Sequence, residues 1–136
     1  MAANAFLFEE FLAREADAGR LDLKFTGTAR HILVHGHCHQ KALTGTAATI
    51  KVLNLPPNFH VEEIDSGCCG MAGSFGYEKE HFEVSKQVGQ ERLLDVVAAS
   101  AEDVEIAAVG TSCRHQIADF TGRKARHWVE ILVEAL

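Results

Sequence analysis

The sequence lacks several features that mark particular classes of protein. Its two prolines are adjacent, at Pro56 and Pro57, and it has one tryptophan and one tyrosine among 136 residues. No linker-like segment divides it and no segment repeats, so we expect a single domain over residues 1–136. No apolar run approaches the roughly 18 residues that a membrane-spanning helix needs.

The sequence also lacks a basic run. Its formal net charge is −6, which disfavours nucleic acid and anionic membranes as partners. The first ten residues contain no lysine or arginine and reach acid at Glu9 and Glu10, unlike a signal peptide. We therefore expect a cytoplasmic protein that has no membrane span and meets the inner face of the membrane only through partners. In that compartment, clustered cysteines indicate metal or redox chemistry more often than structural disulfides.

The most informative feature is a set of four cysteines with the spacing C-x29-C-C-x43-C. They are Cys38, the adjacent pair Cys68 and Cys69, and Cys113. This spacing is neither the C-x2-C of most zinc ribbons nor the tight cysteine run of bacterial ferredoxins. A metal centre built from these residues would have to be assembled from distant parts of the chain.

Short apolar runs alternate with helical patterns along the chain. We predict strands over about 31–35, 60–64 and 104–109, and a short edge strand over 21–25. We predict helices over about 4–18, 41–54, 77–99, 113–120 and 128–136, with Asn4 as a cap and Gly19 as a stop for the first. The alternation indicates the α/β class, with a parallel sheet of three to four strands flanked by helices.

Each cysteine follows a predicted strand. Because ligand sites in open parallel sheets lie beyond the carboxyl ends of the strands, we expect the four sulfurs to converge at one edge of the sheet. Four thiolates suit either an iron–sulfur cluster or a structural zinc ion. Buried core cysteines are the plainer alternative. The expected metal ligands are Cys38, Cys68, Cys69 and Cys113, with His37, His39 and His115 as substitutes.

Glycines surround the adjacent cysteines. They let the backbone approach a bound group closely and turn N–H groups toward cluster sulfurs. We therefore expect Gly67, Gly70 and Gly73 to contribute to cofactor binding.

Two blocks of sequence carry a resemblance to a known family. Cys68-Cys69-Gly70, together with the upstream segment His37-Cys38-His39-Gln40-Lys41, resembles the cysteine-rich CCG domain family. That family includes a heterodisulfide reductase subunit and the iron–sulfur subunits of glycolate, anaerobic glycerol-3-phosphate and lactate-utilisation oxidoreductases. The blocks 67–78 and 110–117 are similar to the C-terminal iron–sulfur part of FAD-linked D-lactate or glycolate dehydrogenase-like oxidases.

The resemblance implies an iron–sulfur module of the 4Fe-4S type that relays electrons from a flavin in a 2-hydroxyacid oxidoreductase. FAD would be bound by the parent or partner protein, because no dinucleotide fingerprint is present here. The implied partners are that flavin domain or subunit and other iron–sulfur centres, and the chain would be a C-terminal fragment of a larger flavoprotein. The family motif ends in C-x-x-C, whereas this sequence has Gln116 at the last position.

Three functional classes follow from these observations. The first is the electron-transfer module, which should not turn over alone and should dock its partner through an apolar patch near Met71, Phe75 or Phe120. The second is a zinc-stabilised binding or scaffolding domain without a redox role. The third, a thiol–disulfide enzyme using Cys68 and Cys69, is disfavoured because a disulfide between adjacent cysteines is strained.

Overall fold

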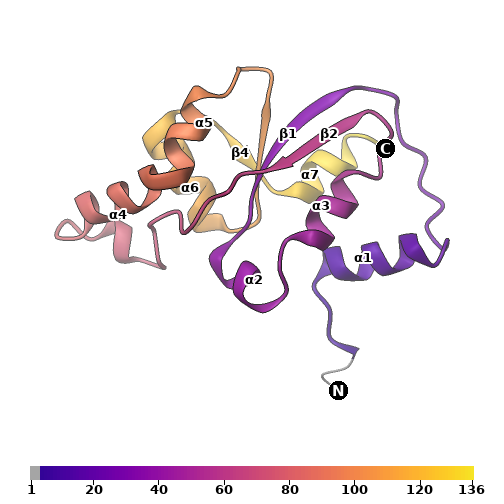
Figure 1. The fold of residues 1–136 in the computed structure, drawn as a ribbon, viewed down its shortest axis with the longest axis horizontal. Coiled ribbons are helices and arrows are strands. Elements are labelled where there is room, and N and C mark those ends of the chain that lie inside the picture. Colours follow the sequence, from indigo (N-terminus) through magenta and orange to yellow (C-terminus); the bar gives the residue numbers. More distant parts are fainter. Residues whose placement is uncertain (1–3) are drawn as a thin grey trace.

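A four-stranded parallel sheet forms the centre of the molecule, for which a computed structural model describes residues 4–136 (Figure 1). The strands are β1 (Arg30–His35), β2 (Phe59–Glu63), β3 (Glu105–Ala108) and β4 (Ala125–Arg126). Their order is β2-β1-β3-β4, and each neighbouring pair is parallel. The predicted α/β class and the three main strands are therefore confirmed, and β4 is the fourth strand.

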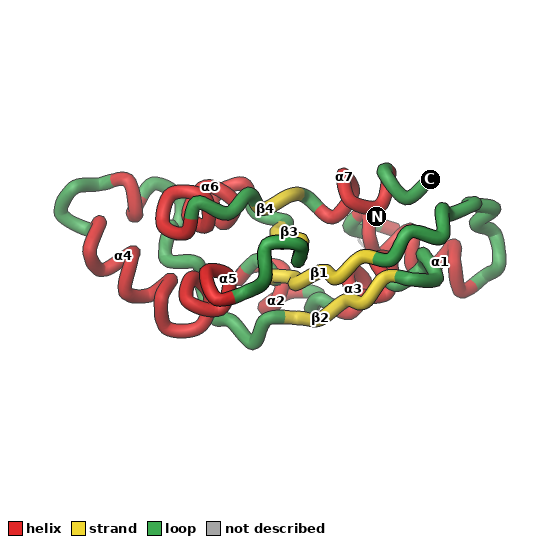
Figure 2. The backbone as a smooth tube through the Cα atoms, turned by 90° about the horizontal axis from the view of Figure 1, so that it is seen from above, coloured by secondary structure: helices red, strands yellow, loops and turns green. Residues whose placement is uncertain are grey.

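Helices cover both faces of this sheet, as the view from above in Figure 2 shows. One layer contains α1 (Phe8–Asp17), α3 (Ala47–Leu53) and α7 (Trp128–Val133). The other contains α4 (Phe82–Gly89), the π-helical segment η3 (Gln90–Leu94), α5 (Asp95–Ala99) and α6 (Thr111–Thr121). The short helix α2 (Cys38–Leu43) follows the carboxyl end of β1, and a 3-10 turn, η2 (Phe75–Tyr77), precedes α4.

The alternation of side chains along β1 explains the two layers. Ile32 and Val34 point to the core shared with α1, α3 and α7, whereas Leu33 packs against the core shared with η3, α5 and α6. Successive side chains of a strand face opposite sides of the sheet, so Ile32, Leu33 and Val34, which are covered on both faces, are all apolar.

The predicted edge strand over 21–25 is wrong. This segment lies in a loop, and Leu21, Leu23 and Phe25 line a hollow with Ala16 and Leu55. The nearby Thr26 donates its N–H to the carbonyl of Ala135 at 2.6 Å rather than to a strand. Apolar alternation here serves packing against helices instead of sheet pairing.

Three predicted helices differ from the structure. The first begins at Phe8 rather than at Asn4, and Gly19 ends it as predicted, with a φ of 64°. The segment 41–54 is two helices, because Gly45 adopts a left-handed φ of 75° and ends α2. The segment 77–99 becomes α-helical only at Phe82 and contains the π-helical turn η3.

None of the helices in residues 4–136 has the length and apolar character to cross a bilayer.

Candidate metal centre

Cys38 is positioned by the start of α2, directly beyond β1. It is the first residue of that helix, and His37 precedes it as the cap, accepting the His39 N–H on Nδ1 at 3.3 Å. The Cys38 thiol is half-buried and contacts the thiol of Cys68.

The adjacent cysteines lie in the loop that follows β2. The N–H of Gly70 donates to the Cys68 sulfur at 3.3 Å, and the N–H of Met71 donates to the Cys69 sulfur. Gly70 has a φ of 94°, and the carbonyl of Ser85 occupies the place that a side chain would take. Only glycine fits this position, so the loop turns its N–H groups toward the sulfurs.

Cys113 comes from the first turn of α6, beyond β3. Its side chain is buried, with 1% of its surface exposed, and its thiol lies against the sulfur of Cys69. Cys38, Cys68 and Cys69 line one pocket of about 440 Å³ together with His37 and His39. The three strand ends thus bring all four cysteines to the carboxyl edge of the sheet, and all four are free thiols.

The sulfurs are close but not equally spaced. Cys69, Cys113 and the imidazole of His35 form one group in which all ligand atoms lie within 4.8 Å of one another. Cys38 forms a second group of the same kind with His37 and His39. Among the described residues, the four sulfurs do not all lie within that distance of one another.

The close sulfurs alter each other's protonation. The Cys113 thiol donates toward the Cys69 sulfur, and His35 and the Met71 N–H reinforce this, so the pKa of Cys69 is lowered despite its burial. The same contact raises the pKa of Cys113, and burial adds to that increase. Burial is also the main reason why the pKa of Cys68 is raised. The site therefore favours a thiolate at Cys69, the species that binds metal.

His35 is the functional residue that sequence reasoning missed. It is fully buried at the end of β1, its Nδ1 lies 2.7 Å from the Ser66 hydroxyl, and its ring lies against the Cys69 and Cys113 sulfurs. Lys41 donates to the Ser66 carbonyl and hydroxyl, and so it holds the Ser66 side chain beside His35. Histidines at 31, 35, 37 and 39 make this segment stand out in the sequence. Their spacing alone does not show that His35 is the one beside the sulfurs.

His115, an expected substitute ligand, and Gln116 both have hydrogen-bond partners other than the cysteines. His115 is exposed, and its Nδ1 lies 2.8 Å from the hydroxyl of Tyr77. Gln116, at the position of the family's last cysteine, is buried and donates to the Ser85 hydroxyl at 2.9 Å. Gln116 thus connects α6 to α4 instead of offering a ligand.

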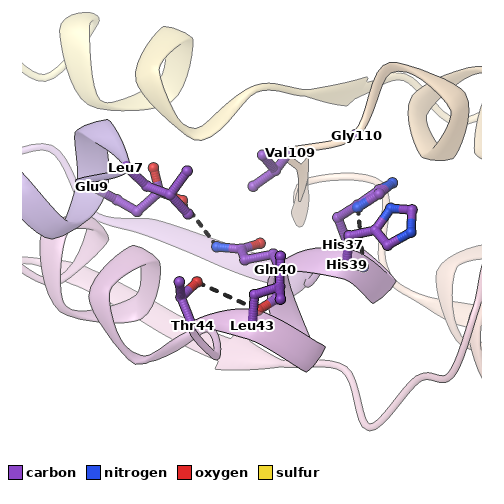
Figure 3. A pocket seen from close by; sticks show the side chains of 9 residues that line it. All are labelled: Leu7, Glu9, His37, His39, Gln40, Leu43, Thr44, Val109 and Gly110. Atoms are coloured by element: carbon purple, nitrogen blue, oxygen red, sulfur yellow. Dashed lines mark hydrogen bonds between the residues drawn. The ribbon is translucent and has the colours of Figure 1, made fainter. Parts of the chain in front are cut away.

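A second pocket, of about 340 Å³, adjoins the cysteine pocket and shares His37 and His39 with it. Figure 3 shows Leu7 and Glu9 on one side and α2 on the other. Glu9 is buried and accepts from the side-chain amide of Gln40 at 2.9 Å. The pocket is mostly apolar, with Leu43 and Val109 in its lining.

Comparison with known proteins identifies homologous segments. The chain is 28% identical over 130 residues to a subunit of the anaerobic glycerol-3-phosphate dehydrogenase of Escherichia coli (strain K12), covering 96% of this chain and 32% of that protein. It is 30% identical over 102 residues to the D-2-hydroxyglutarate dehydrogenase of the same organism, covering 74% of this chain and 10% of that protein. A D-2-hydroxyglutarate dehydrogenase of Pseudomonas putida is 35% identical over 69 residues, which cover 51% of this chain and 7% of that protein.

No family model matches the chain, and no solved structure shows significant similarity to it. The chain spans about a third or less of the length of these relatives. The predicted kinship with segments of such dehydrogenases is confirmed, while assignment to the CCG family stays a prediction.

Proposed function

We propose that this chain is an iron–sulfur electron-transfer module, of the 4Fe-4S type, in a FAD-linked 2-hydroxyacid oxidoreductase. The observation that carries the proposal is the convergence of four free thiols from three strand ends on one edge of the sheet. The kinship with segments of two dehydrogenases supports the same interpretation. FAD would be bound by the rest of the parent protein or by a partner.

The donor set does not fit a single zinc ion held by all four thiolates. A Zn–S bond of about 2.3 Å limits two sulfurs on one zinc to a separation of about 4.6 Å. The four sulfurs do not all meet even a 4.8 Å limit. A cluster offers iron atoms at separate corners, so it does not require every pair of sulfurs to meet that limit.

The chain's own residues would do two things at this site. Cys38, Cys68, Cys69 and Cys113 would supply the thiolates, and the N–H groups of Gly70 and Met71 would donate to two of these sulfurs. Such hydrogen bonds, together with burial, set the reduction potential of an iron–sulfur centre. When bound, the cluster supplies one-electron transfer.

A partner would dock beside this edge through an apolar surface. The predicted candidate Met71 is wrong, because its side chain is 1% exposed and belongs to the core. Exposed apolar side chains lie on α2, at Leu43, and on α4, where Phe82 packs against the half-buried Phe120 with ring centroids 5.3 Å apart. Val84 and Val88 of the same helix are also exposed. We take this α4 face as the docking surface.

Rapid mixing of the reconstituted chain with a reduced flavoprotein tests this function. We expect the cluster to be reduced, and the Phe82→Asp variant to slow reduction without changing iron content. Glu83→Gln, on the same helix, serves as the control. We expect no oxidation of lactate, glycolate or 2-hydroxyglutarate by the isolated chain with added FAD, and robust turnover would contradict the proposal.

One observation favours a second candidate. His35, Cys69 and Cys113 form a compact buried group that supplies three of the four ligands a structural zinc ion takes. In that case the chain would be a zinc-stabilised binding or scaffolding domain with no redox role.

A further inference from the structure

A second group of metal-ligating side chains lies away from the cysteines, on strands β1 and β2. His31 and His60 are directly opposite each other in the register of these parallel strands, and their ring centroids are 4.9 Å apart. Glu62 lies two residues beyond His60, so it is on the same face of the sheet. The backbone pairing of two strands therefore brings two imidazoles and a carboxylate together.

The three side chains converge on one point. The Nε2 atoms of His31 and His60 lie 2.7 and 2.8 Å from the same carboxylate oxygen, Oε1 of Glu62. All three ligand atoms lie within 4.8 Å of one another. Within residues 4–136, no lysine or arginine pairs with Glu62, and its side chain is 51% exposed.

The surroundings of Glu62 favour a cation. An open cavity of about 440 Å³ adjoins it, and its lining contains the carboxylates of Glu62, Glu63, Asp65 and Glu91 against one cation, Arg92. Negative charges gathered beside an open cavity attract cations to it. The cavity also leaves room for water molecules to complete a coordination shell.

We propose that His31, His60 and Glu62 form a surface site for a divalent cation of the zinc class. Two imidazoles and one carboxylate are a ligand set that suits zinc, with water in the remaining position. To bind the ion, each imidazole presents the Nε2 lone pair and keeps its proton on Nδ1. An ion held here would join the edge strand β2 to the central strand β1.

The test is a Zn²⁺ titration of the reduced protein, followed through the imidazole ¹⁵N and ¹H signals of each histidine. The cysteine thiolates also bind zinc, so a readout at individual histidines separates the two sites. We expect the His31 and His60 signals to shift together and saturably. We expect His60→Gln to abolish the His31 shift and weaken zinc binding at this site by more than about tenfold.

His81→Gln is the matched control, because His81 is a part-exposed histidine that pairs with a single carboxylate, Glu78, at 2.8 Å. It should leave the His31 and His60 shifts unchanged. The proposal is overturned if the two signals stay fixed in wild type while the thiolates take up zinc. It is also overturned if His60→Gln, or His31→Gln in its place, binds zinc at this site as wild type does.

Discussion

A ring nitrogen of His35 and the sulfur of Cys69 lie within 4.8 Å of each other, in a pairing that only the fold creates. His35 ends β1 and Cys69 follows β2, and the parallel pairing of these strands brings both to one edge of the sheet. The imidazole beside the sulfur favours the thiolate form of Cys69 and so lowers its pKa.

His35→Phe separates the two candidate functions, because the ring is kept while both nitrogens are lost. If His35 is a hydrogen-bond donor to a cluster ligand, iron bound per chain should stay near the wild-type value. The unfolding free energy of the apo protein should fall by about 1–3 kcal/mol, since the buried Ser66 hydroxyl loses a partner. Loss of all metal from a variant that remains folded would instead make His35 a ligand, as the zinc alternative requires.

Cys69→Ser should abolish metal assembly. Because metal binds only the folded state, its loss should remove about 4 kcal/mol of stability at a free metal concentration a thousandfold above Kd. The melting temperature of the apo protein should change much less. Ser112→Ala, which alters the lining of the same pocket without removing a thiol, is the control. Equal destabilisation of the loaded and apo proteins would show that Cys69 is a packing residue.

Gln116→Cys should not add a metal ligand, although it restores the family's cysteine pattern. Gln116 is buried and donates to Ser85, so its replacement should lower the unfolding free energy by about 1–3 kcal/mol. Iron per chain should be unchanged. Gln87→Ala, at an exposed position of α4, should change stability by less than about 0.5 kcal/mol. A gain in bound iron in Gln116→Cys would contradict the structural role assigned to Gln116.

Stability should depend on pH through Glu134. Arg126 and then Arg30 donate to its carboxylate, and they lower its pKa to about 2. The unfolded carboxyl has a pKa of about 4.3. The stabilisation is therefore complete above about pH 4.3 and is lost as the pH falls from there toward 2.

Urea unfolding at pH 7 and at pH 2.5 measures this effect. Glu134→Gln should lower the midpoint at pH 7 and should differ less from wild type at pH 2.5. Glu80→Gln, at an exposed carboxylate, is the control. If the urea midpoints of Glu134→Gln and wild type differ equally at both pH values, the ion pairs of Glu134 are not the source of that difference.

The main strands and the edge that holds the site are predictable because apolar runs and cysteines alternate along the chain. The strand β4 is not, since Ala125–Arg126 is too short to show a pattern. The break at Gly45 depends on a left-handed backbone that composition alone does not require. The role of His35 depends on the register between β1 and β2, which decides which of several histidines faces a sulfur.

Iron and acid-labile sulfide per chain, measured after anaerobic purification and reconstitution, test the central claim most directly. We expect about four of each per chain in wild type, as a 4Fe-4S cluster requires, and almost none in Cys69→Ser. Stoichiometric zinc without sulfide would contradict it and would favour the zinc site at His35, Cys69 and Cys113.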